Sequence, residues 1–343
     1  MDLCRISLLA FGCCGFALGQ PLGQPGNAPR LGANAPTLDY KEVPDWPTQA
    51  TNAAGKPAAW NFIQVSGVAL DARGHVLVLH RGAHPFLEFE SNGKFVQSWS
   101  NVMFSEGKVA AIAPGDRVRG QSAYSAVYGP AGCDSCGAHS VRVDPEHNIW
   151  VVDATGQVIY KMDQQGKVMM QLGQKGVAGT GHNNFNLPTD VGFAPNGDFY
   201  VTDGYAGSRV VKFSHEGRYL LEWGTRGKGP GQFELPHNVV VDAQGKVYVT
   251  DRENRRIEVF DSNGKFLTEW PTIEGVSGLL ITKDQQIWAG GVLLNLKGEI
   301  VGRLPKASAA GGHAVAANDS GDVYLAQLSG KVQKFVKVKP SAP

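Results

Sequence analysis

Short apolar runs separated by polar turns recur along most of this chain. In the clearest copy, between Gly137 and Asp153, an alternating segment with Val141 and Val143 precedes a polar turn, and a β-branched and aromatic run (149–152) follows it. Alternation and short β-branched runs predict two antiparallel strands joined by a turn. The pattern therefore indicates an all-β protein.

This unit occurs six times when the bulky residue of its second strand is aligned with the turn residue six positions earlier. The pairs, turn residue first, are Asp71 with Leu77, Asp144 with Trp150, Ala194 with Tyr200, Asp242 with Tyr248, Thr282 with Trp288, and Asn318 with Tyr324. The better copies continue into two more strands, predicted at 209–213 with 219–223 and at 256–260 with 266–270. Four short strands repeated at roughly 35–50 residues predict the blades of a β-propeller. We expect one six-bladed ring over residues 38–338.

The sixth copy lacks a strand, because little sequence remains after residues 331–338. We expect a segment within residues 38–64 to supply it and close the ring, which would remove two free sheet edges. The alternative is an unpaired N-terminal arm that lies over the rim. Residues 339–343 are expected to be a short tail.

The N-terminus has the pattern of an export signal. Arg5 precedes an apolar run (6–18) that is too short to span a bilayer, and a small-x-small pattern precedes Gln20. We therefore expect residues 1–19 to be a signal peptide, cleaved after Gly19, and the protein to be secreted or periplasmic.

Residues 20–37 are rich in Pro, Gly, Asn and Ala and are expected to form a flexible linker. A lipid anchor on Cys13 or Cys14 is the alternative to cleavage, although Phe11 fits a lipobox poorly. The formal net charge is +1, with both signs interspersed, so nucleic acids and acidic membrane surfaces are not expected as partners. No membrane span is expected beyond the signal, and we expect a monomer.

Histidine recurs at one position of the repeat. Five residues before the turn residue, the six copies read Ser66, His139, Thr189, His237, Ser277 and His313. The first strand of each blade lines the channel of a propeller, so equivalent positions face one axis. Histidines from alternate blades, about 120° apart, would converge there, and three imidazoles with an open fourth position are typical of catalytic zinc. The small hydroxyl residues between them would leave room for a ligand.

Two cysteines, Cys133 and Cys136, remain after the expected cleavage. In an oxidising compartment we expect a short-range disulfide that stiffens the loop before His139. Zinc ligation by the two thiolates is the alternative. A single Cys-x-x-Cys pair without a second pair is weak support for it.

A long insertion lies between Trp99 and Gly132. It carries the potential binding residues Arg117, Arg119, Tyr124 and Tyr128. Long loops on a rigid scaffold often cover a binding face. An excursion over the surface without a function is the alternative.

Polar residues gather where the second strands end. They are His80, Arg81, Asp153, Asp203, Tyr205, Asp251 and Arg252. The fork of an arginine suits carboxylate recognition, and a tyrosine near a metal can act as a base. For the aspartates we favour a structural role, tying turns or pairing with the arginine that starts the next strand. For Arg81, Arg252 and Tyr205 both interpretations stay open.

Several segments carry a family resemblance. Leu235 to Asp242, Asp251 to Phe260 and Gly229 to Phe233 look like NHL repeats. More narrowly, the chain resembles the peptidyl-α-hydroxyglycine α-amidating lyases from about residue 65 to 335, and the specific segments are Asp203-Gly-Tyr205 and Asp251-Arg252-Glu-Asn.

This resemblance implies that His139, His237 and His313 hold zinc, that Tyr205 is the base, and that Arg81 and Arg252 bind the substrate carboxylate. The implied reaction cleaves a peptide or small molecule ending in α-hydroxyglycine to the amide and glyoxylate.

The resemblance also implies a structural calcium ion bound by backbone carbonyls at Val68 and Val141. The family usually adds an aspartate directly after the third histidine. This chain has Ala314 there, which counts against calcium.

Two other functions compete with the lyase. The first is a non-enzymatic NHL propeller that binds a protein or glycan through its rim. The second is a calcium-dependent, lactonase-like hydrolase. Its chemistry needs carboxylate and amide ligands around the axis, where this chain offers histidines.

Overall fold

The computed structural model describes residues 35–51, 57–58, 60–100, 104–105, 134–272, 275–306 and 311–338. The predicted signal peptide, nearly all of the predicted linker and the predicted tail lie outside these residues. The same holds for most of the insertion, with Arg117, Arg119, Tyr124 and Tyr128, and for Cys133. The expectations for these segments stay predictions.

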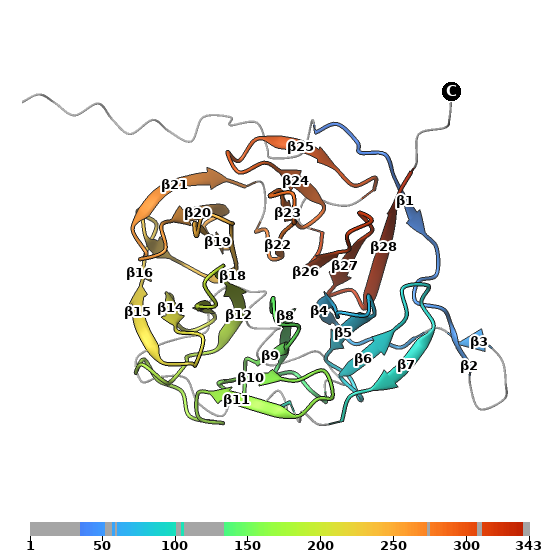
Figure 1. Ribbon diagram of the computed structural model, residues 1–343, viewed down its shortest axis with the longest axis horizontal. Coiled ribbons are helices and arrows are strands. Elements are labelled where there is room, and N and C mark those ends of the chain that lie inside the picture. The colour runs from blue at the N-terminus through green and yellow to red at the C-terminus, as the bar shows by residue number, and fades with distance from the viewer. Residues whose placement is uncertain are drawn as a thin grey trace, which may run out of the picture.

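Six four-stranded antiparallel sheets stand around one axis and form a six-bladed propeller (Figure 1). From the axis outward, blade 1 contains β4 (Val65–Leu70), β5 (Val76–His80), β6 (Phe86–Phe89) and β7 (Phe95–Ser98). Blade 2 contains β8 (Ala138–Val143), β9 (Ile149–Asp153), β10 (Val158–Met162) and β11 (Val168–Leu172). Blade 3 contains β12 (Pro188–Phe193), β13 (Phe199–Asp203), β14 (Arg209–Phe213) and β15 (Tyr219–Trp223).

The remaining blades follow the same order. Blade 4 contains β18 (Pro236–Val241), β19 (Val247–Asp251), β20 (Arg256–Phe260) and β21 (Phe266–Pro271). Blade 5 contains β22 (Leu279–Ile281), β23 (Ile287–Ala289), β24 (Val292–Leu294) and β25 (Ile300–Arg303). Two short pairs lie outside the blades, β2 (Ala50–Thr51) with β3 (Pro57–Ala58) and β16 (Thr225–Arg226) with β17 (Gln232–Phe233).

Blade 6 combines both ends of the described chain. Its strands are β26 (Ala314–Ala317), β27 (Val323–Gln327), β28 (Lys331–Lys337) and, at the outer edge, β1 (Tyr40–Val43). The β1 strand pairs antiparallel with β28, with Tyr40 opposite Lys337 and Val43 opposite Lys334. The prediction of an all-β, six-bladed propeller is confirmed. The strand sought within residues 38–64 lies at 40–43.

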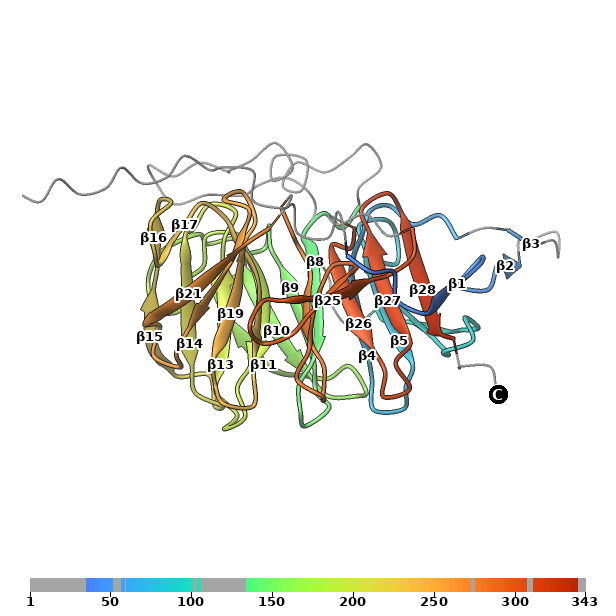
Figure 2. The same cartoon turned by 90° about the horizontal axis from the view of Figure 1, so that it is seen from above.

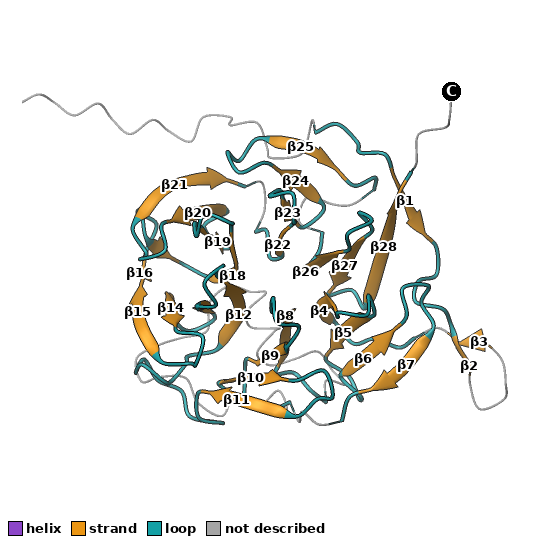
Figure 3. Cartoon of the chain, in the orientation of Figure 1, coloured by secondary structure: helices purple, strands orange, loops and turns teal. Residues whose placement is uncertain are grey.

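Seen from the side, the inner strands of the blades run roughly along the propeller axis, whereas the outer strands β21 and β25 are strongly inclined to it (Figure 2). Strands and turns make up the described part of the chain, which contains no helix (Figure 3). Nothing in that part forms an apolar helix of membrane-spanning length.

The six-residue spacing of the repeat has a physical cause. In blade 2, Trp150 Nε1 donates to Asp144 Oδ2 at 2.9 Å, and in blade 4 the Tyr248 hydroxyl donates to Asp242 Oδ2 at 2.9 Å. The other carboxylate oxygen accepts the backbone N–H groups two and four residues further on. One aspartate thus closes the turn and anchors the second strand. Blade 3 has Ala194 instead, and the Tyr200 hydroxyl donates to a backbone carbonyl of blade 4.

The hydrophobic core lies between neighbouring blades. Trp150 and Val152 of blade 2 pack with Val191, Phe199 and Val211 of blade 3 in one buried cluster. Corresponding clusters join the other blades, including blade 6 to blade 1. Each blade therefore buries its apolar faces only when both neighbours are present.

The aspartates that end the second strands have the structural role favoured from the sequence. Asp203 Oδ2 lies 3.1 Å from Arg209 Nε, and Asp251 Oδ2 lies 3.1 Å from Arg256 Nε. Asp153 accepts hydrogen bonds from the backbone and hydroxyl of Ser105. These carboxylates therefore hold neighbouring strands and loops in place.

Glu258 on β20 is a buried carboxylate that is not fully satisfied. Its Oε1 accepts the N–H of Gly231 and lies 3.5 Å from Arg256, whereas Oε2 has no hydrogen-bond partner among the described residues. Burial raises the pKa of Glu258 from its ordinary 4.5 to about 7. A carboxyl whose pKa is raised on folding costs stability increasingly as pH rises from its unfolded pKa through its folded pKa.

We predict that Glu258→Gln raises the unfolding free energy by about 1–3 kcal/mol at pH 8, and that the gain vanishes near pH 4. Denaturant unfolding at several pH values measures it. The matched control is Glu88→Gln, which changes a buried glutamate on the third strand of blade 1. Both Glu88 oxygens have partners, with Arg73 at 2.6 Å and Trp99 at 3.1 Å, so this change should destabilise the protein. A Glu258→Gln gain that does not vary with pH would contradict the assignment.

Candidate metal centre

Three histidines meet on the propeller axis. His139 lies on β8, His237 lies on β18, and His313 directly precedes β26. All three are buried, and their ring centroids are 5.0, 4.9 and 4.8 Å apart. One nitrogen from each ring lies within 4.8 Å of the other two. The convergence predicted from the repeat register is present, and the group could bind a metal ion.

Each imidazole is oriented by the next blade. His139 Nδ1 lies 2.6 Å from Thr189 O, His237 Nδ1 lies 3.2 Å from Ser277 O, and His313 Nδ1 lies 2.7 Å from Ser66 O. Because a carbonyl oxygen can only accept, each Nδ1 carries the hydrogen. Each Nε2 is then left as a lone-pair donor, as a metal ligand requires.

The carbonyl acceptors belong to the hydroxyl residues of blades 1, 3 and 5. The sequence indicated that these residues leave room for a ligand and missed this orienting role. Their hydroxyls bond elsewhere: Ser66 Oγ donates to Ala138 O at 2.8 Å and Thr189 Oγ1 to Pro236 O at 3.0 Å. Histidine and hydroxyl residues therefore alternate along the repeat because each histidine blade donates an Nδ1–H hydrogen bond to a backbone carbonyl of the hydroxyl blade that follows it.

Local irregularities aim these side chains. His139 was expected just before its strand but is the second residue of β8, where the pairing with β9 shifts between Ala138 and Ser140. In β18 the pairing shifts between Pro236 and Val239, around His237. A bulge inserts a residue into one strand and turns its side chain away from the regular alternation. The shift turns these histidines toward the axis.

Burial keeps the imidazoles neutral. It lowers the pKa of His313 to about 3, and nearby Arg81 adds to the effect. Burial also lowers the pKa of His139 and His237 well below the ordinary value, with further contributions from His313 and from the arginines. Neutral imidazoles are the form that binds metal.

Tyr205 completes the wall of the site. Its hydroxyl oxygen lies 2.7 Å from His139 Nε2 and 3.2 Å from His237 Nε2. Gly204 allows this approach, because a Cβ there would collide with the backbone carbonyl of Pro236. Arg252 Cζ lies 5.8 Å from the centre of the Tyr205 ring. The tyrosine hydroxyl therefore faces the same space as the histidine nitrogens.

Arg81 is a buried arginine at this site. Its Nη1 donates to Gln64 Oε1 at 2.6 Å, and its Nη2 is buried without a hydrogen-bond partner among the described residues. Burial lowers its pKa, and the nearby Tyr205 hydroxyl opposes this lowering. Gln64, which sequence reasoning missed, has a positive φ of 47°. Such backbone conformations concentrate at functional sites.

All six candidate residues, His139, His237, His313, Tyr205, Arg81 and Arg252, are thus brought together. Three neutral nitrogen donors fit a transition metal ion such as zinc, and one of them, the buried His313 Nε2, has no hydrogen-bond partner among the described residues. A second described group, Asp71 with His75 and Glu88, is bridged by Arg73 and is less suited to a metal.

The described residues do not fit a calcium ion near Val68 and Val141. Calcium prefers carboxylate oxygens, and Ala314 provides none. Arg142, the residue after Val141, places a guanidinium in the channel, where it is paired with Asp190. A divalent cation beside it would be repelled.

The predicted disulfide stays a prediction. Cys136 is buried in the loop before β8, and Cys133 lies outside the described residues. The alternative of zinc ligation by both thiolates is likewise open. Among the described residues, the three-histidine group does not include Cys136.

Comparison with known proteins agrees with this fold. A family model described as a 6-bladed beta-propeller matches residues 188–271. Peptidylglycine alpha-amidating monooxygenase from Rattus norvegicus is 30% identical over 206 residues, which are 59% of this chain and 19% of that protein. A probable peptidyl-alpha-hydroxyglycine alpha-amidating lyase from Caenorhabditis elegans is 30% identical over 160 residues, 46% of this chain and 43% of that protein. The resemblance seen in the sequence is confirmed.

Other similarities are broader. NHL repeat-containing protein 3 from Homo sapiens is 28% identical over 308 residues, 80% of each protein. The structure of virginiamycin B lyase from Staphylococcus aureus has a TM-score of 0.51, with 14% identity over 88% of this chain and 90% of that one. This structural likeness shows the fold alone. The chain matches about a fifth of the rat protein and less than half of the nematode protein.

We predict that a divalent transition metal ion stabilises the folded protein through the triad. At a free ion concentration of about 100 Kd, binding adds about 2.7 kcal/mol, which thermal unfolding with and without a chelator measures. His237→Ala should abolish the difference, because two imidazoles remain. The control His215→Ala removes a partly exposed histidine of blade 3 and should preserve it. Equal chelator effects in the two variants would contradict the site.

Proposed function

We propose that this protein is a zinc-dependent lyase that cleaves N-acyl- or peptidyl-α-hydroxyglycine to the amide and glyoxylate. One observation carries the proposal. Three neutral histidines converge with a tyrosine hydroxyl 2.7 Å from one of them, beside two arginines. The rat and nematode relatives, named for peptide α-amidation, support the same chemistry.

The arginines would recognise the substrate carboxylate. Arg81 has a buried Nη2 without a partner among the described residues, so it can donate to an anion without breaking a bond. Arg252 is buried and lies over the Tyr205 ring. A guanidinium binds a carboxylate through two parallel hydrogen bonds, which would fix the α-carbon between Tyr205 and the triad.

Tyr205 would move the proton. We propose that it takes the proton of the substrate hydroxyl as the C–O bond becomes a carbonyl. The C–N bond then breaks, its electron pair stays on the amide nitrogen, and that nitrogen gains a proton. The products are the amide and glyoxylate, so atoms and electrons balance. A zinc ion held by the triad would supply Lewis-acid stabilisation of the hydroxyl oxygen.

The substrate class follows from the site. An anionic carboxylate suits the uncompensated charge of Arg81, and the acyl or peptide part would extend toward the mouth of the channel. We propose a peptide or small-molecule substrate with a C-terminal α-hydroxyglycine. Export to a secreted or periplasmic location and a monomeric state are proposed with it from the sequence.

A second candidate function is a non-enzymatic NHL propeller that binds a protein or glycan through its rim. The observation that favours it is the match to NHL repeat-containing protein 3, which spans 80% of this chain. Such a protein would use its rim loops and would not need metal at the axis. Metal content therefore separates the two functions.

We predict glyoxylate release from α-hydroxyhippurate, with one zinc per chain. Tyr205→Phe keeps the ring and removes the hydroxyl, and it should lower kcat by about 10²–10⁴-fold, the usual contribution of a positioned base. Tyr219→Phe on β15, a partly exposed tyrosine, is the control and should retain activity. A folded protein that releases no glyoxylate in the presence of zinc would favour the binding function instead.

Arg252 should act mainly on substrate binding. Arg252→Lys keeps the charge but loses the two-pronged donor, so we expect KM to rise about tenfold or more. The increase should be much smaller for an α-hydroxy amide that lacks the carboxylate. Steady-state kinetics with both substrates measure the difference. An equal rise in KM for both substrates would show that Arg252 does not recognise the carboxylate.

A further inference from the structure

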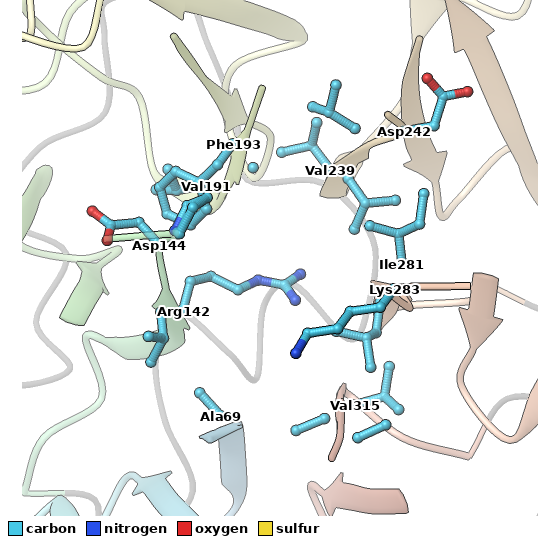
Figure 4. Close-up of a pocket in the computed structure, with 18 of the residues that line it drawn as sticks. Ala69, Arg142, Asp144, Val191, Phe193, Val239, Asp242, Ile281, Lys283 and Val315 are labelled. Carbon is cyan, nitrogen blue, oxygen red and sulfur yellow. The ribbon is translucent and has the colours of Figure 1, made fainter. Parts of the chain in front are cut away.

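The side chain of Arg142 crosses the channel and joins four blades. From β8 in blade 2, its Nε and Nη2 donate to the two oxygens of Asp190 in blade 3, at 2.8 and 2.5 Å. Nη2 also lies 3.1 Å from Asn238 Oδ1 in blade 4, and Nη1 donates to Leu279 O in blade 5 at 3.0 Å. Blades 2 and 5 stand opposite each other, so the guanidinium reaches across the axis (Figure 4).

The acceptors of this guanidinium are themselves fixed. Asp190 is buried and also accepts from Ser140 Oγ at 2.6 Å and from Val239 N at 3.2 Å. Asn238 Oδ1 accepts from Leu279 N at 2.8 Å, and its amide donates to a backbone carbonyl. One partly buried cation, whose side chain is 13% exposed, and one buried carboxylate therefore form a satisfied network, in which ion pairing is strong.

The network borders the triad. Asp190 directly follows Thr189, whose carbonyl oxygen orients His139. Asn238 directly follows His237 and donates to its carbonyl oxygen at 3.1 Å. A shift of either residue would move an imidazole or the acceptor that orients it.

A cavity of about 480 Å³ lies on the side of Arg142 that faces away from the triad (Figure 4). Its walls are largely aliphatic and include Val68, Val191, Val239, Ile281 and Val315. The six candidate site residues, all described, do not line it. The guanidinium thus lies between this cavity and the triad.

We propose that Arg142 is a positioning residue that acts as a built-in structural cation. It holds the strands of the triad at fixed spacing and lies across the channel behind them, so that no second metal ion is required there. The inference rests on the proposed metal site, but the cross-link itself belongs to the scaffold and exists without metal.

Hydrogen exchange on the metal-free protein tests the cross-link. In Arg142→Met, the amides of Val239 and Leu279 should exchange about tenfold faster or more, because their acceptors lose the guanidinium. The control Arg73→Met removes an arginine of blade 1 that is paired with the carboxylates of Asp71 and Glu88, and it should leave both amides unchanged. If Arg142→Met does not fold, Arg142→Met/Asp190→Asn removes both charges, and the readout is then the Leu279 amide, whose acceptor Asn238 is unchanged. Unchanged protection would overturn the cross-link.

Metal affinity tests the positioning. Competition with a chromophoric chelator should show zinc affinity at least about tenfold weaker in Arg142→Met than in Arg73→Met, as for loss of other supporting contacts around a metal. Arg142→Lys should recover part of it, because the charge returns without the fork. Affinity within twofold of wild type, in a folded Arg142→Met protein, would overturn the positioning role.

The outcomes separate this inference from the proposed function. If the wild-type protein binds zinc but releases no glyoxylate, the proposed lyase function is wrong. Hydrogen exchange and zinc affinity then still test the role of Arg142. If the wild-type protein binds no zinc, both the proposed metal site and the positioning role of Arg142 are wrong. Hydrogen exchange still tests whether Arg142 cross-links the blades. Millimolar calcium should leave the melting temperature of the wild-type protein unchanged. If calcium raises the melting temperature of wild type and of Arg73→Met but not that of Arg142→Met, then calcium binds at the Arg142 site, and the proposal of a built-in cation is wrong.

Discussion

The site depends on one interaction made three times, the hydrogen bond from an imidazole Nδ1–H to a backbone carbonyl of the next blade. It fixes which nitrogen carries the hydrogen and points the other at the axis. The bond from His313 to Ser66 joins residues 247 positions apart, on the last and first blades. The third histidine is therefore oriented only when the ring is closed. A metal ion held by the triad would therefore depend on the whole ring, because no single blade supplies the three ligands.

Charge is arranged in layers along the axis. The neutral triad lies between Arg81 and Arg252 on one side and Arg142 on the other. Arg142 is balanced by the buried carboxylate of Asp190. Arg81 has an amide, a backbone carbonyl and Tyr205 as its described contacts, so its charge has no described carboxylate partner. The field on that side favours an incoming anion and also helps to keep the histidines unprotonated.

Local spacing explains what the sequence could predict. Asp144 and Trp150 bond within one hairpin, so counting from turn to strand found the blades and the histidine register. Long-range contacts explain what it missed. Gln64 reaches Arg81 across 17 residues and Arg142 reaches Leu279 across 137, and no period relates these positions. At the position of Arg142 in the repeat, the other copies carry Ala69, Gly192, Val240, Leu280 and Ala316.

The cost of the site argues for a ligand. A buried polar group without a partner costs about 1–3 kcal/mol, more when it is charged. Arg81 Nη2 and His313 Nε2 are both in this state among the described residues, and both belong to one site. A propeller that binds only through its rim could replace them with apolar residues at a gain in stability. An anion on Arg81 and a metal ion on the triad would each satisfy one of these groups. The two unsatisfied groups are therefore easier to explain as groups that bind a ligand than as structural parts of the scaffold.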